Sequence, residues 1–225
     1  KARETWERSV PITRENKDAV RPALLYLNSR GLRASSATNI ARFSPSVYDG
    51  PAIIFPAMNE LGEVQGIQSV LLTAEGRKRE HNGISKYSRG VMAGNVMRVG
   101  EGEAIILTEG PEDALSVRQA VGDEATVVCT FGKAGMSTYN VPRASDVTIC
   151  ADPDLNVDAV SDVLSGDGST SVYVVRFNAL GVDNVKDAND YLREVGETKL
   201  REALAVAKPV EQEVQEALEA ERQWP

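Results

Sequence analysis

Short apolar runs alternate with amphipathic stretches along the second half of the chain. The apolar runs predict four strands, at residues 104–108, 126–129, 147–151 and 171–175. Two stretches between them, residues 111–121 and 155–164, have the spacing of helices. Short strands that alternate with helices are typical of a parallel sheet with helices on both faces. This half is therefore predicted to have an α/β fold.

The start of the chain has a helical pattern. Residues 2–8 and 17–30 are predicted to be helices, the second because apolar positions within 23–27 recur at helical spacing and face the core. Gly31 follows directly and is a suitable residue for the end of that helix.

A different pattern begins at about residue 51. Strands are predicted at 52–56, 64–72 and 96–99, and residues 59–62 form a hairpin turn between the first two. Residues 75–94 are polar, basic and contain glycine, which predicts a loop. The first hundred residues are therefore expected to form a smaller α+β subdomain.

The end of the chain, residues 197–224, is predicted to be a charged helix that is interrupted at Pro209. A solvated helix is the simpler interpretation, and a segment that leads to a partner or to a helicase domain is the alternative. We expect three parts in all: a basic α+β subdomain at 1–100, an α/β domain at 101–195 and a helical extension at 196–225.

The net charge of −8 argues against a protein that simply coats nucleic acid. The charge is unevenly spread, however, because residues 1–100 carry +6 and residues 101–225 carry −14. A basic half can contact phosphate groups, and an acidic half can hold cations.

The two cysteines, Cys129 and Cys150, lie inside apolar runs, so buried free thiols in a cytoplasmic protein are expected. With a single histidine, they cannot form a structural zinc site. No apolar run approaches the roughly 18 residues of a membrane helix, and no membrane partner is expected. The chain begins at Lys1 without a signal-peptide pattern and is interpreted as a piece of a longer protein.

Acidic residues follow two of the predicted strands. Glu109 comes directly after the first strand of the α/β half, and Asp152 directly after the strand that ends at 151. Asp113 lies one helical turn beyond Glu109, and Asp154 lies at the expected start of a helix. Ligand sites of parallel sheets gather at these strand ends. Clustered carboxylates repel one another without a cation, and ligation by oxygen alone favours Mg²⁺ or Mn²⁺.

Two of the acids have simpler interpretations. Asp154 could be a helix cap, and so could Asp187, which precedes another predicted helix. Lys186 beside it offers a cation for phosphate if a strand ends nearby. Two acids at two strand ends of one sheet, Glu109 and Asp152, favour a functional site over capping.

Three segments in this order resemble the Toprim domain of phage and plasmid primases and primase-helicases. They are Leu107–Ser116 with its Glu-Gly pair, Ile149–Asp154 with its Asp-x-Asp pair, and Lys186–Leu192 with its Lys-Asp pair. Their order and spacing agree over about residues 102–195. The resemblance implies a Toprim-type fold in which Glu109, Asp113, Asp152 and Asp154 are catalytic and Glu109, Asp152 and Asp154 hold Mg²⁺ or Mn²⁺.

The first half resembles, more weakly, the region that precedes Toprim in such proteins, through Tyr26–Leu32 and Lys86–Gly90. This implies a basic face near the acidic site that includes Lys86 and Arg89. Arg98, Lys186 and Asp187 complete the expected nucleotide or nucleic-acid site; a solvated basic loop is the alternative for the first two.

The resemblance implies an enzyme that makes RNA primers on single-stranded DNA from nucleoside triphosphates, within a larger phage or plasmid protein. A helicase domain or subunit is a further expected partner. The family usually has glycine where this chain has Val157, and no zinc-binding module is present. A degenerate, non-catalytic Toprim module that binds DNA or a helicase is therefore one alternative. DNA nicking of the Toprim type is another, although neither Tyr139 nor Tyr191 stands out as its nucleophile.

Overall fold

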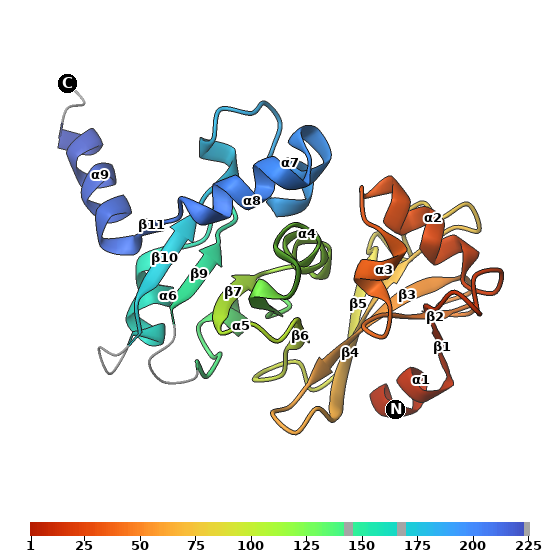
Figure 1. The fold of residues 1–225 in the computed structure, drawn as a ribbon. Helices are drawn as coiled ribbons and strands as arrows, with labels where there is room; N and C mark the ends of the chain where they lie inside the picture. The colour runs from red at the N-terminus through yellow and green to blue at the C-terminus, as the bar shows by residue number, and fades with distance from the viewer. Residues whose placement is uncertain (142–145, 166–169, 223–225) are drawn as a thin grey trace. The chain divides into compact units, whose positions relative to one another are not determined.

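The computed structural model describes residues 1–141, 146–165 and 170–222, and the chain divides into two compact units, Lys1–Val99 and Gly100–Pro225 (Figure 1). Unit 1 contains an antiparallel sheet with the strand order β1-β2-β3-β4-β5. The strands of this sheet are β1 (Val10–Pro11), β2 (Arg42–Ser44), β3 (Ala52–Met58), β4 (Val64–Leu71) and β5 (Lys86–Gly90). A further strand of unit 1, β6 (Met97–Val99), is not part of this sheet. The helices of unit 1 are α1 (Ala2–Arg8), α2 (Arg21–Ser29) and α3 (Ala34–Ala37).

The core of unit 1 forms on both faces of β3, which is buried along almost its whole length. On one face Ala2 of α1 packs with Ile54 and Ile67, and α2 contacts β3 on the other (Figure 1). The predicted turn between β3 and β4 is confirmed: Asn59 N–H donates to Glu63 O over 3.1 Å, and Gly62 has the positive φ of +76° that this turn requires.

Two predictions for unit 1 were wrong in part. Residues 75–94 contain the strand β5, which is the edge strand of the sheet. Edge strands carry charged and polar residues, and that composition hides them in a search for apolar alternation. The second helix begins at Arg21 and not at 17, because Pro22 occupies its first turn, where a missing N–H is tolerated.

Unit 2 contains a mainly parallel sheet whose strands, within this unit, run in the order β11-β10-β9-β7-β8. They are β7 (Ala104–Thr108), β8 (Ala125–Cys129), β9 (Val147–Cys150), β10 (Val172–Val175) and the antiparallel edge strand β11 (Lys208–Pro209). The helices are α4 (Pro111–Val121), η1 (Gly122–Glu124), α5 (Lys133–Met136), α6 (Val157–Leu164), η2 (Phe177–Ala179), α7 (Ala188–Val195), α8 (Glu197–Ala205) and α9 (Val210–Arg222).

Helices lie on both faces of this sheet, which confirms the predicted α/β class. α4, α7 and α8 pack against one another on one face, and α6 packs against α9 on the other (Figure 1). Cys129 and Cys150 are buried free thiols, as expected, and burial raises the pKa of the Cys150 thiol. Among the residues described, none of the helices combines the length and the apolarity that a membrane span requires.

Two boundaries in unit 2 differ from the prediction. α6 begins at Val157, two residues later than predicted, because Asn156 is its N-cap and accepts from Ala159 N–H over 3.2 Å. The tail is helical on both sides of Pro209, as predicted, but the interruption is a short strand, in which Lys208 and Pro209 pair with β10. Trp224, the expected end of that helix, lies outside the described residues.

Candidate active site

The candidate site of unit 2 lies where the order of the parallel strands reverses. After β7 the chain places β8 on one side of it and β9 on the other. Such a reversal opens a crevice outside the carboxyl ends of the strands. Glu109 directly follows β7, and Asp152 lies just after β9. The fold therefore brings the two acids that sequence analysis emphasised to one edge of the sheet.

The carboxyl groups of Glu109 and Asp152 lie close enough for each to change the pKa of the other. Burial is the main cause that raises the pKa of Glu109, and the charge of Asp152 raises it further. Burial and then the charge of Asp187 raise the pKa of Asp152. Two carboxyl groups this close must share a proton or be neutralised by a cation.

A cation from the neighbouring strand end already lies beside this pair. Lys133, at the start of α5 after β8, forms an ion pair with Asp154. This contact lowers the pKa of the Asp154 carboxyl, and Lys133 also lowers the pKa of Glu109. Asp154 is exposed and is not the cap of α6, so the capping interpretation of this residue was wrong.

Asp113 joins the start of α4 to the start of α7. Its Oδ1 accepts a hydrogen bond from the backbone N–H of Asn189 over 3.0 Å. Burial, followed by the charge of Asp187, raises the pKa of Asp113 well above its usual range. A Cβ atom at Gly110 would lie 2.7 Å from Asp113 Oδ2, so only glycine leaves room for this arrangement.

Asp187 is a helix cap, as the simpler interpretation held, because it accepts from Asp190 N–H over 2.7 Å at the start of α7. It also acts on the acidic group, through its electrostatic effect on Asp113 and Asp152. The preceding Lys186 is exposed. Capping and a place beside the acids are therefore not exclusive for this residue.

The donors of this region are suited to a hard divalent cation. They are carboxylate oxygens from the segments that follow β7 and β9, and Mg²⁺ and Mn²⁺ prefer such ligands. Glu109 Oε2 is buried without a hydrogen-bond partner in the described part of the chain, as expected of an atom that awaits a ligand. In the same ranges, no three His, Cys, Asp or Glu side chains converge closely enough to hold a metal. Because Asp154 is paired with Lys133, it could bind a metal ion only if Lys133 released it.

Val157 lies at the position where sequence analysis expected glycine. It is the first residue of α6, and its side chain is only 5% exposed. Burial of this side chain fixes the start of α6 three residues after Asp154. Valine at this position therefore has a packing role, and its burial keeps the start of α6 in place.

The basic residues of unit 1 are more scattered than expected. Lys86 and Arg89 are both exposed on β5, but three residues apart on a strand places their side chains on opposite faces. A single basic face that includes both is therefore wrong. Arg98, on β6, is half-buried and donates to Asn59 O over 3.5 Å.

Arg89 instead borders a cluster of aromatic rings. The ring centroid of Tyr48 lies 5.0 Å from that of His81, in a stacked arrangement, and 4.4 Å from that of Tyr87. Tyr48, Tyr87 and Arg89 line a pocket of about 180 Å³ in unit 1. Tyr48 is exposed, so this aromatic cluster of Tyr48, His81 and Tyr87 offers a surface for stacking.

The turn that presents Tyr48 is held by an arginine. Tyr48 and Asp49 both have positive φ, +48° and +63°. The Arg79 guanidinium donates to Val47 O over 2.6 Å and to Tyr48 O over 2.8 Å. A Cβ at Gly50 would lie 2.6 Å from Arg79 Nε, so glycine at this position allows the guanidinium to approach.

Sequence analysis missed Lys133 and the aromatic cluster. The sequence does contain a signal for Lys133, because this residue follows a strand of the same sheet as Glu109 and Asp152. A base at a strand end can belong to a site as well as an acid can. No such signal existed for the cluster, since Tyr48 and His81 lie far apart in the sequence.

An open, mainly parallel sheet with acidic residues at two adjoining strand ends is the arrangement of the Toprim class. Residues 104–198 match the family model of the Toprim domain, and residues 1–99 match a domain of unknown function (DUF7146). Residues 104–198 therefore carry a Toprim domain. No curated protein has a detectably similar sequence.

Solved structures of primases share the fold. A DNA primase domain from Pseudomonas aeruginosa is 13% identical at a TM-score of 0.62, over 97% of this chain and 81% of that one. A DnaG primase catalytic domain bound to single-stranded DNA is 14% identical at 0.60, over 88% and 75%. The primase fragment of the bacteriophage T7 primase-helicase protein is 14% identical at 0.54, over 80% and 73%.

Proposed function

We propose that the chain performs metal-dependent nucleotidyl transfer of the primase type, making RNA primers on single-stranded DNA within a larger phage or plasmid replication or transfer protein. The observation that carries this proposal is the pair of neighbouring acids, Glu109 and Asp152, at the sheet reversal of a Toprim domain. The primase structures with the same fold, one of them with bound single-stranded DNA, support the choice of reaction.

The acids have different roles in this proposal because their environments differ. Asp152 and Asp154 would hold Mg²⁺ or Mn²⁺ beside the triphosphate of the incoming nucleotide, and Lys133, which pairs with Asp154, would contact that phosphate instead. Glu109, whose pKa is raised by burial, accepts the proton of the attacking 3′-hydroxyl or holds a second ion, with Asp113 supporting it. A bound divalent ion would stabilise the charge on the attacking and leaving oxygens of an in-line displacement.

The remaining basic residues contact the substrates. Lys186, exposed beside Asp187, binds phosphate of the nucleotide. In unit 1, Arg89 contacts the template backbone beside Tyr48, whose exposed ring stacks on a template base.

A non-catalytic module that binds DNA or a helicase is the second candidate. The ion pair of Lys133 with Asp154 favours it, because an internal cation neutralises one of the expected metal ligands. Nicking has less support, since Tyr139 and Tyr191 are only 9% and 8% exposed and neither is presented as a nucleophile.

The test compares Asp152→Asn with Asp158→Asn. Asp158 is an exposed acid in the first turn of α6 and is the matched control. We expect Asp152→Asn to lower Mn²⁺ affinity in calorimetry and primer synthesis on single-stranded DNA by about 100-fold or more without unfolding, because the buried donor is lost. Asp158→Asn keeps both.

Each result decides between the candidates. Primer synthesis retained by Asp152→Asn would overturn the site assignment. A wild-type protein that binds no metal and makes no primer, yet binds DNA in a salt-sensitive way, supports the non-catalytic module. Cleavage of DNA without added nucleotides supports nicking.

A further inference from the structure

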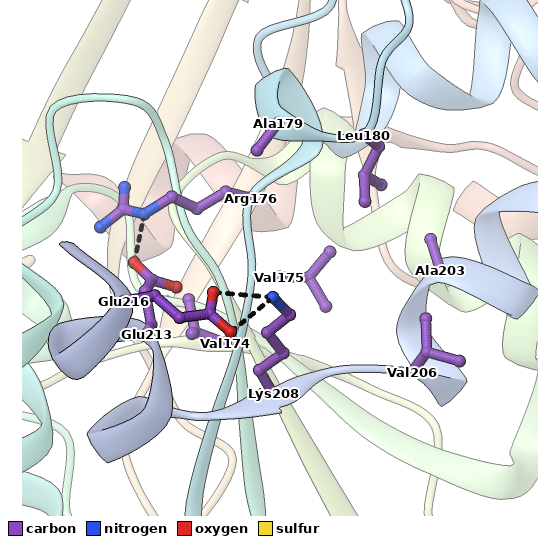
Figure 2. A pocket seen from close by; sticks show the side chains of 10 residues that line it. All are labelled: Val174, Val175, Arg176, Ala179, Leu180, Ala203, Val206, Lys208, Glu213 and Glu216. Atoms are coloured by element: carbon purple, nitrogen blue, oxygen red, sulfur yellow. Dashed lines mark hydrogen bonds and ion pairs between the residues drawn. The ribbon is translucent and has the colours of Figure 1, made fainter. Parts of the chain in front are cut away.

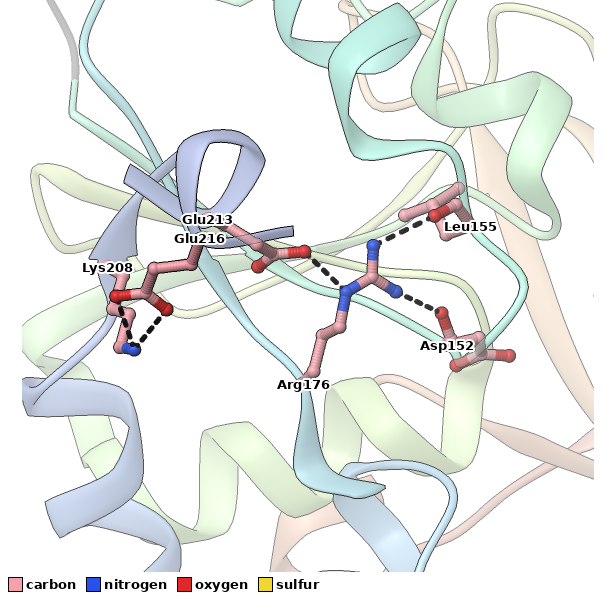
Figure 3. A network of polar contacts seen from close by, with 6 residues as sticks. All are labelled: Asp152, Leu155, Arg176, Lys208, Glu213 and Glu216. Carbon is pink, nitrogen blue, oxygen red and sulfur yellow. Dashed lines mark hydrogen bonds and ion pairs between the residues drawn. The ribbon is translucent and has the colours of Figure 1, made fainter. Parts of the chain in front are cut away.

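A guanidinium group holds the turn that carries Asp152 and Asp154. Leu155 N–H donates to Asp152 O over 3.0 Å, which closes the turn at residues 152–155. Arg176, directly after β10, donates from Nη1 to Asp152 O and from Nη2 to Leu155 O, each over 3.0 Å (Figure 3). One side chain therefore fixes both ends of the Asp-x-Asp turn.

The same guanidinium is tied to the last helix. Its Nε lies 2.5 Å from Glu213 Oε1 of α9, and the Arg176 and Glu213 side chains are 22% and 24% exposed. An ion pair shielded to this degree, with the guanidinium fully engaged, is stronger than an exposed pair. Glu213 orients Arg176, and Arg176 orients the turn.

α9 is fastened to the sheet here mainly by charged contacts. A pocket of about 420 Å³ separates α9 from β10 and α8, with Val175, Leu180 and Val206 on its apolar wall (Figure 2). Across it α9 is held by Glu213 to Arg176 and by Glu216 to Lys208, the latter over 2.9 Å. A change in the position of α9 would move Glu213 and, through this ion pair, the Arg176 guanidinium.

We propose that Arg176 is a positioning residue for the Asp152–Leu155 turn and that Glu213 makes α9 a regulator of the acidic site. α9 lies beyond residues 104–198, the part that matches the Toprim model. A partner that binds α9 and shifts it would thereby change the spacing of Asp152 and Asp154. The metal-binding consequence rests on the proposed function, whereas the coupling of α9 to the turn does not.

The test uses two substitutions on one helix, Glu213→Gln and Glu216→Gln. Each removes one carboxylate of α9 that takes part in an ion pair, but only Glu213 contacts Arg176. Hydrogen exchange of residues 150–158 is measured without metal, followed by Mn²⁺ calorimetry. Arg176→Lys is the third variant, because lysine keeps the charge but cannot reach both carbonyl oxygens in the same plane.

We expect faster exchange of the Leu155 amide in Arg176→Lys and in Glu213→Gln, and wild-type exchange in Glu216→Gln. Mn²⁺ affinity should fall by about tenfold in Arg176→Lys and about threefold in Glu213→Gln, in line with the loss of a residue that supports a ligand. Equal exchange in the two glutamine variants overturns the regulatory role of α9, and unchanged exchange in Arg176→Lys overturns the positioning role. If the wild type binds no Mn²⁺, the proposed function fails while the exchange result still decides this inference.

Discussion

Each unit uses one arginine to fix one turn, and the two arginines are anchored differently. In unit 1, Arg79 donates to the backbone oxygens of Val47, Tyr48 and Leu72. In unit 2, Arg176 donates to the backbone oxygens of Asp152 and Leu155 and to the Glu213 carboxylate. Arg79 donates to neutral carbonyl groups, whereas Arg176 also pairs with the negative charge of Glu213 on α9.

This difference separates a structural clamp from an adjustable one. The Tyr48 backbone is left-handed, which costs a bulky residue roughly 1–3 kcal/mol, and Arg79 offsets that strain. The Asp152–Leu155 turn contains no residue with positive φ. Arg176 therefore has no strain of this kind to offset, and its contact with Glu213 makes the turn depend on α9.

The largest expected effect is on stability, from the same substitution in both clamps. Arg79→Lys should lower the free energy of unfolding of unit 1 by about 3 kcal/mol, because carbonyl oxygens lose charged partners while the strained turn remains. Arg176→Lys should lower that of unit 2 by only about 1 kcal/mol. Calorimetric unfolding of the whole chain, in which the units can melt separately, measures both.

Equal losses in the two variants would contradict this distinction between the clamps. The control is Arg3→Lys, since Arg3 is an exposed residue of α1 that pairs with Glu7 four residues along the helix. It should unfold as the wild type does, because exposed pairs of this kind contribute little.

The acids were predictable because each depends on local sequence alone. Glu109 and Asp152 follow apolar strands, and parallel topology brings such strand ends together without further information. The cap at Asp187 was predictable for the same reason, as an acid just before a helical pattern.

Contacts that join distant segments were not predictable in this way. Arg176 follows β10, but nothing in the local sequence shows that its guanidinium reaches the carbonyl oxygens of residues 152 and 155. Nor does it show that α9 places Glu213 beside Arg176. The strand β5 was missed because an edge strand with Lys86 and Arg89 lacks apolar alternation. Long-range packing, and not residue type, decides these features.

The acidic site should also make the metal-free protein sensitive to pH. Asp113, Asp152 and Glu109 have raised pKa values, so folding favours their protonated forms. That stability is fully present below the ordinary pKa of a carboxyl and is lost as pH rises through the raised values. With a chelator present, melting temperature should therefore fall as pH rises above the ordinary pKa of a carboxyl group.

Asp113→Asn tests this dependence directly. Asparagine keeps the acceptor for the Asn189 N–H but cannot ionise. The variant should be more stable than the wild type above the ordinary pKa of a carboxyl group, and its stability should depend less steeply on pH. Asp158→Asn, at an exposed position, should follow the wild type. Parallel curves for wild type and Asp113→Asn would show that burial of Asp113 carries no penalty. No comparable pH dependence is expected from the Arg79 clamp, because its partners are carbonyl groups.

The smallest effect concerns what the rigid clamp of unit 1 is for. If Arg79 holds the turn so that the exposed ring of Tyr48 can stack on a template base, Tyr48→Ala should weaken binding of single-stranded DNA by about fivefold, or roughly 1 kcal/mol. Tyr48→Phe keeps the ring and should bind as the wild type does, and fluorescence anisotropy with a labelled oligonucleotide measures all three. An alanine variant that binds like the wild type would leave the turn a structural feature of unit 1. A loss shared by the phenylalanine variant would assign the effect to the hydroxyl group instead of the ring. A difference in DNA affinity between the alanine and phenylalanine variants would explain the strained backbone at Tyr48, because Arg79 then maintains that strain in order to present the ring.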